Sequence, residues 1–125
     1  MTDSILIHTK KLLGLTEDDH SFDMDVILHI NSAFQRLNQL GVGPSEIFMI
    51  EDSTATWSDF FGDDDILPSV PIYVYYKTRV GWDPPTGGAL DSMNREIERM
   101  EWLLNVTVDP SKSEKEAMNL GPLWG

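Results

Sequence analysis

The sequence contains no cysteine, which excludes disulfide bonds and thiolate metal sites. It also lacks long apolar runs, since none approaches the roughly 20 residues that cross a bilayer as a helix. Its first residues do not combine a basic region with an apolar core, so they do not resemble a secretory signal. We therefore expect a soluble protein that works inside a cell.

Basic residues are scarce. The 125 residues include 9 Lys and Arg against 21 Asp and Glu, which gives a formal net charge of -12. A surface this acidic repels a phosphate backbone and argues against nucleic-acid binding through a basic footprint. The apolar fraction of 41% is ordinary for a globular protein, and the length suits one small domain with a core of its own.

Motifs that carry catalysis are missing as well. There is no nucleophile elbow, no phosphate-binding glycine loop and no HExxH. His8, His20 and His29 do not show metal-ligand spacing, and His29 lies where packing at the edge of a core is expected. The acidic run at residues 63–65 lacks the spaced ladder of an EF-hand, so a solvated acidic patch is the preferred interpretation. We expect a protein that works through its surfaces, without enzymatic activity, cofactor or metal.

The segment after residue 88 has the clearest helical pattern. Its apolar residues are spaced by three, four, three and four, which predicts one apolar stripe on a helix; they are Leu90, Met93, Ile97, Met100 and Leu104. Asp91 precedes Arg95 by four residues, an orientation that favours a helix. Beyond Asn105 the pattern weakens, and residues 106–108 are expected to be extended.

The first half of the chain predicts two more helices. Asp3 or Ser4 can cap the first, and Gly14 can end it. The second should run from about Phe22 to Leu40, with Ser21 as its cap. Its stripe is broad enough to predict the central helix; the members are Phe22, Val26, Ile27, Ile30, Ala33, Phe34, Leu37 and Leu40.

Two segments remain ambiguous by local pattern. Residues 46–51 could form a short strand or a turn of helix. Residues 70–76 have the high β-propensity of a strand, although no second convincing strand exists to pair with them. Between these segments, Thr54 or Thr56 could cap a short helix that buries Trp57, Phe60 and Phe61 and ends at Gly62.

Three stretches in combination carry a family resemblance: YVYYKTR, then GWDPPT, then RMEWLLN. Together they resemble the head–tail connector proteins of long-tailed bacteriophages, also called head-completion or adaptor proteins. The resemblance covers the chain from about Ile5 to Val106. The matching residues are Tyr73, Tyr75, Lys77, Arg79, Trp82, Asp83, Pro84, Pro85, Glu101, Trp102 and Asn105.

The resemblance implies an all-α fold, a small bundle of four to five helices with an extended C-terminal arm. It implies an irregular connector at residues 46–51 and a helix from about Ser69 to Val80. One face of that helix would carry Val70, Tyr73, Val74 and Lys77, while Tyr75 and Tyr76 would point toward a neighbouring subunit.

The resemblance also implies a function in assembly. Copies would form a ring, twelvefold on the portal protein, that joins the portal to the next connector or tail-completion protein and extends the DNA channel. The protein would belong to the virion at the head–tail interface and to the host cytoplasm during assembly. Genomic DNA would pass an acidic lumen without specific binding, because like charges repel. The alternative is a small acidic helical binding protein, either antitoxin-like or a regulatory adaptor.

Particular residues are assigned structural or interface roles. The corner of Trp82, Asp83, Pro84 and Pro85 should set the angle between the last two helices, because proline restricts its own backbone and that of the residue before it. Trp102 is expected to widen the apolar stripe as a buried anchor.

The C-terminal arm is predicted to begin at the Asp109-Pro110 boundary. This divides the chain into a helical connector domain, residues 1–109, and an arm, residues 110–125. Leu120, Leu123 and Trp124 follow a charged linker and suggest a docking peptide. The alternative is a frayed tail whose tryptophan packs on its own domain.

Overall fold

The computed structural model describes residues 3–63 and 67–108. Those ranges contain five helices and no strand; a single bridge joins Ser4 to Thr56. The small all-α bundle is therefore confirmed. The helices are α1 (Ile5–Leu12), α2 (Asp23–Gln39), α3 (Trp57–Phe61), α4 (Ser69–Trp82) and α5 (Gly88–Val108).

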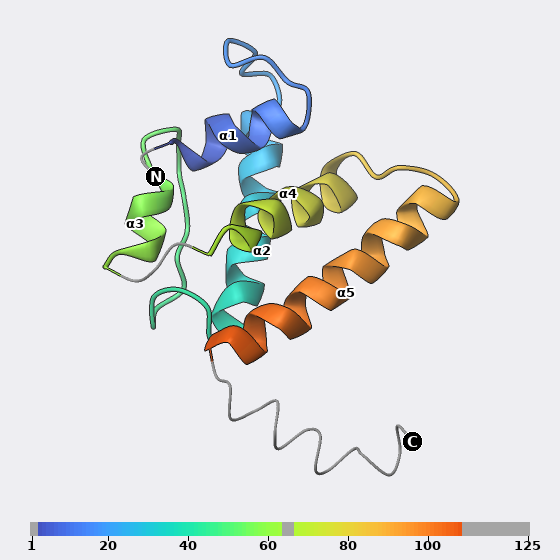
Figure 1. Cartoon of the computed structure of the whole chain (residues 1–125). Helices are drawn as coiled ribbons and strands as arrows, with labels where there is room; N and C mark the ends of the chain where they lie inside the picture. The colour runs from blue at the N-terminus through green and yellow to red at the C-terminus, as the bar shows by residue number, and fades with distance from the viewer. Residues whose placement is uncertain (1–2, 64–66, 109–125) are drawn as a thin grey trace.

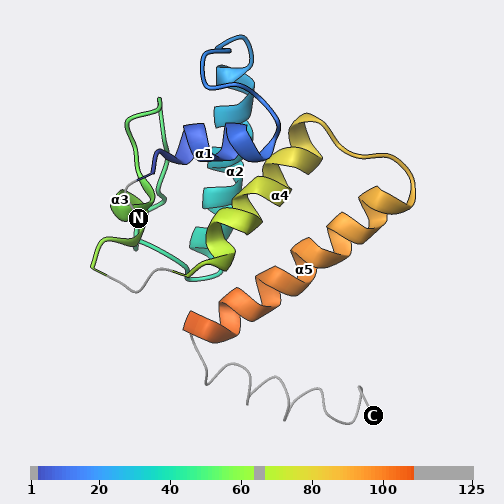
Figure 2. The ribbon, with the colours of Figure 1, turned by 45° about the horizontal axis from the view of Figure 1, so that its top comes forward.

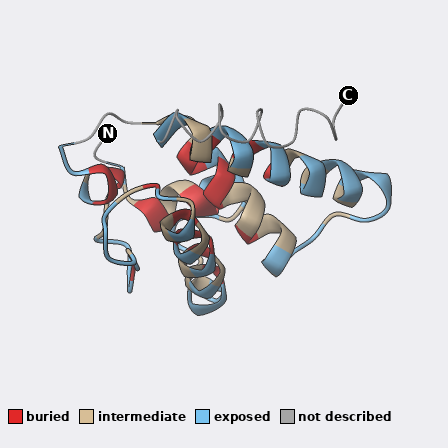
Figure 3. Cartoon of the chain, turned by 90° about the horizontal axis from the view of Figure 1, so that it is seen from below, coloured by how far each residue is buried: buried red, intermediate tan, exposed pale blue. Residues whose placement is uncertain are grey.

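The α2 helix occupies the centre of the bundle, as its broad apolar stripe predicts (Figure 1). It packs chiefly against α4, while α1 touches both α2 and α4. The α5 helix packs against α4, and a long elbow separates the two in both ribbon views (Figure 2). Buried residues gather where the helices meet, whereas one side of α5 is exposed along most of its length (Figure 3).

Side-chain hydrogen bonds cap the starts of α1 and α3. Ser4 caps α1, with its Oγ accepting from the Ile7 amide at 3.2 Å. Thr56 caps α3 in a capping box with Asp59. The predicted Ser21 cap of α2 is wrong: the N-cap position is Phe22, which has no side chain that can accept a hydrogen bond, and the Ser21 amide donates to the Asp19 carboxylate at 3.0 Å. Acidic residues in the first turn still complement the helix dipole.

Two glycines occupy positions where a side chain would be unfavourable. Gly14 has a φ of 83°, the left-handed conformation that ends α1 as predicted. Gly81, near the end of α4, lies against the ring of His29 on α2, where a Cβ would collide with the imidazole. This close approach explains the predicted packing of His29 at the edge of the core.

Residues 70–76 are helical, so the ambiguity over that segment is resolved in favour of α4. Val70, Tyr73 and Val74 are buried as predicted, but Lys77 is only half-buried. Thr78 is buried in its place, because Val70, Val74 and Thr78 follow a four-residue spacing along one face; Pro71 is buried as well. Residues 46–50 have no regular structure, and Phe60 and Phe61 of α3 are buried as predicted.

Two expectations for α5 are wrong. Residues 106–108 are not extended, since α5 continues to Val108, where its end packs beside the end of α2. Trp102 is not a buried anchor: it is 51% exposed, whereas Ile97, Met100 and Leu104 are buried. A residue two positions from Met100 lies about 200° around the helix, on the far side from the stripe.

The C-terminal arm, including Leu120, Leu123 and Trp124, lies outside the described residues, as do residues 64–66. The division at residue 109 stays a prediction. Within the two described ranges, none of the helices combines the length and apolar character required of a membrane span.

Candidate assembly surface

One carboxylate joins three helices at the inner side of α5. Glu101 accepts hydrogen bonds from Arg36 of α2, at 3.2 Å from Nε and 3.1 Å from Nη2, and from the Tyr73 hydroxyl of α4 at 2.7 Å. Tyr73 is fully buried. Burial first, then the hydrogen bond to Glu101 and its charge, raises the pKa of Tyr73, so the phenol stays neutral and donates.

A second bond fixes the end of the same helix. The Asn105 side chain donates to the Leu40 carbonyl at 2.8 Å and so satisfies a group at the end of α2. Glu101 and Asn105 are one turn apart, and both contact the last turns of α2. Three residues of the family resemblance, Tyr73, Glu101 and Asn105, therefore hold α5 in place from inside. We call Arg36, Tyr73, Glu101 and Asn105 the α5 clamp.

The elbow between α4 and α5 is attached at its α4 end by an aromatic contact and a backbone hydrogen bond. Trp82 packs edge-on against Phe22 at the start of α2, with ring centroids 5.3 Å apart. The Asp83 amide donates to the Arg79 carbonyl at 3.0 Å and closes the last turn of α4. Pro84 is exposed and Pro85 half-buried. The chain therefore leaves α4 from a fixed position.

Several aromatic and aliphatic side chains of α4 and α5 are accessible to solvent. Tyr75 and Tyr76 are half-buried, with ring centroids 5.5 Å apart, and Tyr76 also packs against the core. Trp102 and Leu103 of α5 are exposed immediately beside the inward-facing Glu101. Exposed tryptophan and tyrosine are the side chains that most often anchor protein interfaces. We call Tyr75, Tyr76 and Trp102, together with the aliphatic Leu103, the outer aromatic set.

A charged pair accompanies these side chains on α5. Glu96 and Arg99 form an ion pair one turn apart. The hydrogen bond and charge of Glu96 raise the pKa of Arg99, and Tyr76 adds to that effect from α4. Both charges are solvated, so their pairing contributes little to stability.

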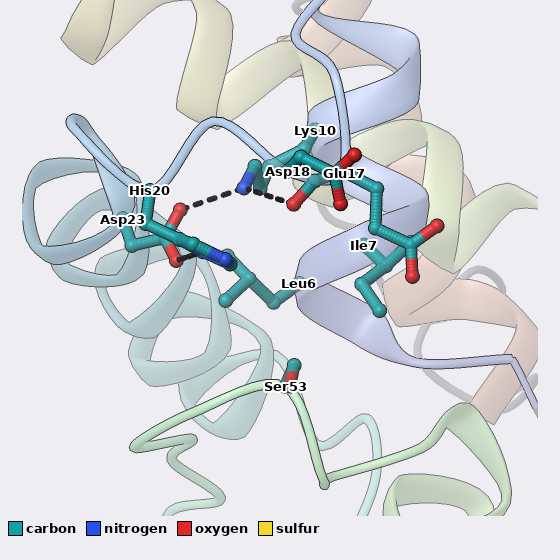
Figure 4. A pocket seen from close by; sticks show the side chains of 8 residues that line it. All are labelled: Leu6, Ile7, Lys10, Glu17, Asp18, His20, Asp23 and Ser53. Carbon is teal, nitrogen blue, oxygen red and sulfur yellow. Dashed lines mark hydrogen bonds and ion pairs between the residues drawn. The ribbon is translucent and has the colours of Figure 1, made fainter.

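A small pocket lies on the other side of the molecule, between α1, the start of α2 and the loop around Ser53 (Figure 4). Lys10 is buried there and bonds Asp23 at 2.8 Å and the carbonyls of Asp19 at 2.6 Å and Glu17 at 3.3 Å. These three partners match the three donors of an ammonium group. The lysine therefore ties the loop before α2 to α1, and the pocket offers no free cation.

The same contacts affect the aspartate. Burial opposes the charged form of Asp23, but hydrogen bonds from Lys10 and His20 outweigh it, so the pKa of Asp23 is lowered. Across the described ranges, no group of three His, Cys, Asp or Glu side chains is arranged to hold a metal ion. The contacts of this region are structural, since they hold α1 against the start of α2 and the loop before it.

The described residues form a small helical module, and its prominent feature is a set of solvent-accessible apolar side chains on α4 and α5. Comparison with known families gives the class: the model of the phage connector protein family matches residues 5–111. The chain belongs to that family. It is a head–tail connector, a component of the phage virion that interacts with other head and tail proteins. No curated protein and no solved structure matches the chain.

The structure separates the residues that the resemblance groups together. Tyr73, Glu101 and Asn105 are internal, whereas Trp102 faces outward and Trp82 packs at the elbow. Sequence reasoning missed Arg36, whose partner Glu101 is 65 positions away. No local spacing could indicate that pairing. The interface roles assigned to Tyr75, Tyr76, Trp102 and the elbow stay predictions.

Proposed function

We propose that copies of this protein form a ring beneath the portal protein, join the portal to the next connector or tail-completion protein, and extend the DNA channel. The observation that carries this proposal is the family match over residues 5–111, which spans every described helix. The family is a structural one. A ring of twelve copies would match the twelvefold symmetry that the resemblance implies for the portal.

Net charge supports a role around DNA without specific binding. A ring of subunits that each carry a formal charge of -12 would place a repelling wall around a polyanion. DNA would then pass without the counterion release that drives adhesion to basic proteins. No particular helix is assigned to the lumen.

The outer aromatic set supplies the contacts between subunits in this proposal. Side chains such as Trp102 offer large contact areas at low entropic cost. The α5 clamp fixes the helix that presents Trp102, and the elbow fixes its direction. The arm, residues 110–125, docks on the portal or a neighbouring subunit through Leu120, Leu123 and Trp124.

Electron microscopy of purified portal mixed with this protein tests the proposal. We expect an added ring of density on one end of the portal, with the portal's symmetry. Heads assembled without the protein should contain DNA but fail to attach tails. Portal that stays unchanged at saturating protein concentration, or heads that join tails normally in its absence, would contradict the proposal.

A further inference from the structure

An irregular segment, residues 44–50, runs along one side of α2; we call it the strap (Figure 1). Asn38 donates to the carbonyls of Pro44 at 3.3 Å and Ser45 at 3.2 Å. Asn31 both donates to and accepts from the Ile50 backbone, at 2.9 and 2.8 Å. The two asparagines are seven residues apart on one helix face, so they hold the strap antiparallel to α2 at both ends.

The strap has an inner and an outer side. Phe48 packs inward against Phe34 and Phe60, with ring centroids 5.1 and 5.3 Å away, and Ile50 is buried. Ile47 and Met49 point outward and are 49% and 63% exposed. This alternation is the side-chain pattern of an extended strand with one buried face.

The strap backbone is unpaired between its two attachments. Among the described residues, no hydrogen bond reaches the amides or carbonyls of residues 46–49. An extended segment with free backbone groups and alternate exposed apolar side chains has the properties of an open sheet edge. Such an edge is the usual site for adding a strand from another chain.

Apolar surface continues from the strap onto α2. Met24 and Leu28 are strongly exposed, and they lie in the same helical row as Asn31 and Asn38, with spacings of four, three and seven. A segment from another chain that paired with the strap could therefore extend past the strap and contact the apolar side chains of Met24 and Leu28.

Negative charge flanks the strap at both ends. Glu46 lies at one end, and Glu51 and Asp52 lie at the other; all three are exposed. Hydrogen bonds from the Thr54 side chain and amide lower the pKa of Asp52 and so favour its charged form. Arg36, two residues from Asn38, is engaged with Glu101.

The geometry points to a docking site for an extended segment of another virion protein, with apolar residues at alternate positions and a basic residue at each end. Its backbone pairs with residues 46–49, its apolar side chains cover Ile47 and Met49, and its cations meet Glu46 and Glu51. The acidic residues at the ends of the strap favour a basic segment over a segment of a second copy of this chain, in which 21 Asp and Glu outnumber 9 Lys and Arg. This site does not depend on ring formation.

Hydrogen exchange and zero-length cross-linking of the full chain test the site. In the free protein, amides 46–49 should exchange rapidly, and in purified virions their exchange should slow by at least about tenfold. A carbodiimide should join Glu46 or Glu51 to a lysine of a different virion protein, identified by mass spectrometry. Ile47→Asp combined with Met49→Asp should abolish both signals.

Ile72→Asp is the matched control, because Ile72 is 48% exposed, nearly the same as Ile47, but lies on α4. It should leave the strap's protection and cross-link intact. Unprotected strap amides in the virion would overturn the proposal, as would a cross-link that joins only copies of this chain. A strap left open in virions whose connector ring is intact would overturn this site without affecting the proposed function.

Discussion

Glu101 is the side chain on which contacts between α2, α4 and α5 converge. Replacing Glu101 with Ala leaves the buried Tyr73 hydroxyl and the Arg36 guanidinium without their partner. Loss of a buried partner costs about 1–3 kcal/mol in the free energy of unfolding. Urea denaturation should show that loss. Glu98→Ala, at an exposed position of the same helix, is the control and should change stability by less than about 0.5 kcal/mol.

The chain offers a second matched pair in its tryptophans. Trp102 is half exposed, whereas Trp57 is fully buried and its indole donates to His8 at 3.1 Å. Trp57→Ala should destabilise the protein by about 3–5 kcal/mol. Trp102→Ala should cost less than about 1 kcal/mol, because about half of its surface is already in contact with water. If both substitutions lower the denaturation midpoint equally, the outward placement of Trp102 is wrong.

The Lys10–Asp23 pair should make the free energy of unfolding depend on pH in the acidic range. The pKa of Asp23 is lower in the folded protein than in the unfolded chain, so its stabilising effect is complete above its ordinary pKa. That effect disappears as pH falls through the lowered value, below about pH 4. Urea midpoints of the wild type and Asp23→Asn should therefore differ most near neutral pH and converge in strong acid. A difference that grows on acidification would contradict this assignment.

At the scale of elements, the elbow is the connection most open to test. Replacing Pro84 and Pro85 with Ala frees two backbone positions that are restricted in the native chain. Because α5 is still held by the clamp, we expect the thermal melt to change little. Attachment to the portal should fall more than stability does, which electron microscopy of the mixture would measure. Normal attachment would show that the elbow does not set the working angle of α5.

The residue pattern within an element predicted that the element exists, but it predicted less well which other elements pack against it. The spacing of Met93, Ile97, Met100 and Leu104 predicted the buried face of α5. The same rule, applied to Trp102, should have placed it outward. The end of α5 could not be read locally, because the Asn105 bond to Leu40 that accompanies its last turn spans 65 residues.

At the scale of the whole molecule, the buried core of the described residues extends from Ile5 to Leu104. Deleting residues 111–125 should therefore leave the helical domain folded, with a thermal midpoint close to that of the full chain. If the arm docks as proposed, portal attachment should be lost. A truncated protein that unfolds would place the arm in the core, and one that attaches fully would remove its docking role.

The sequence by itself determined composition, helical periodicity, most helix ends and the family, because each depends on residue type or local spacing. The sequence also determined the net negative charge on which the proposed repulsion of DNA depends. Only the tertiary structure decided that α5 is clamped through Arg36, Tyr73 and Glu101, that Trp102 faces outward, and that the strap lies open along α2. These features come from contacts between residues far apart in the chain, which no local pattern encodes.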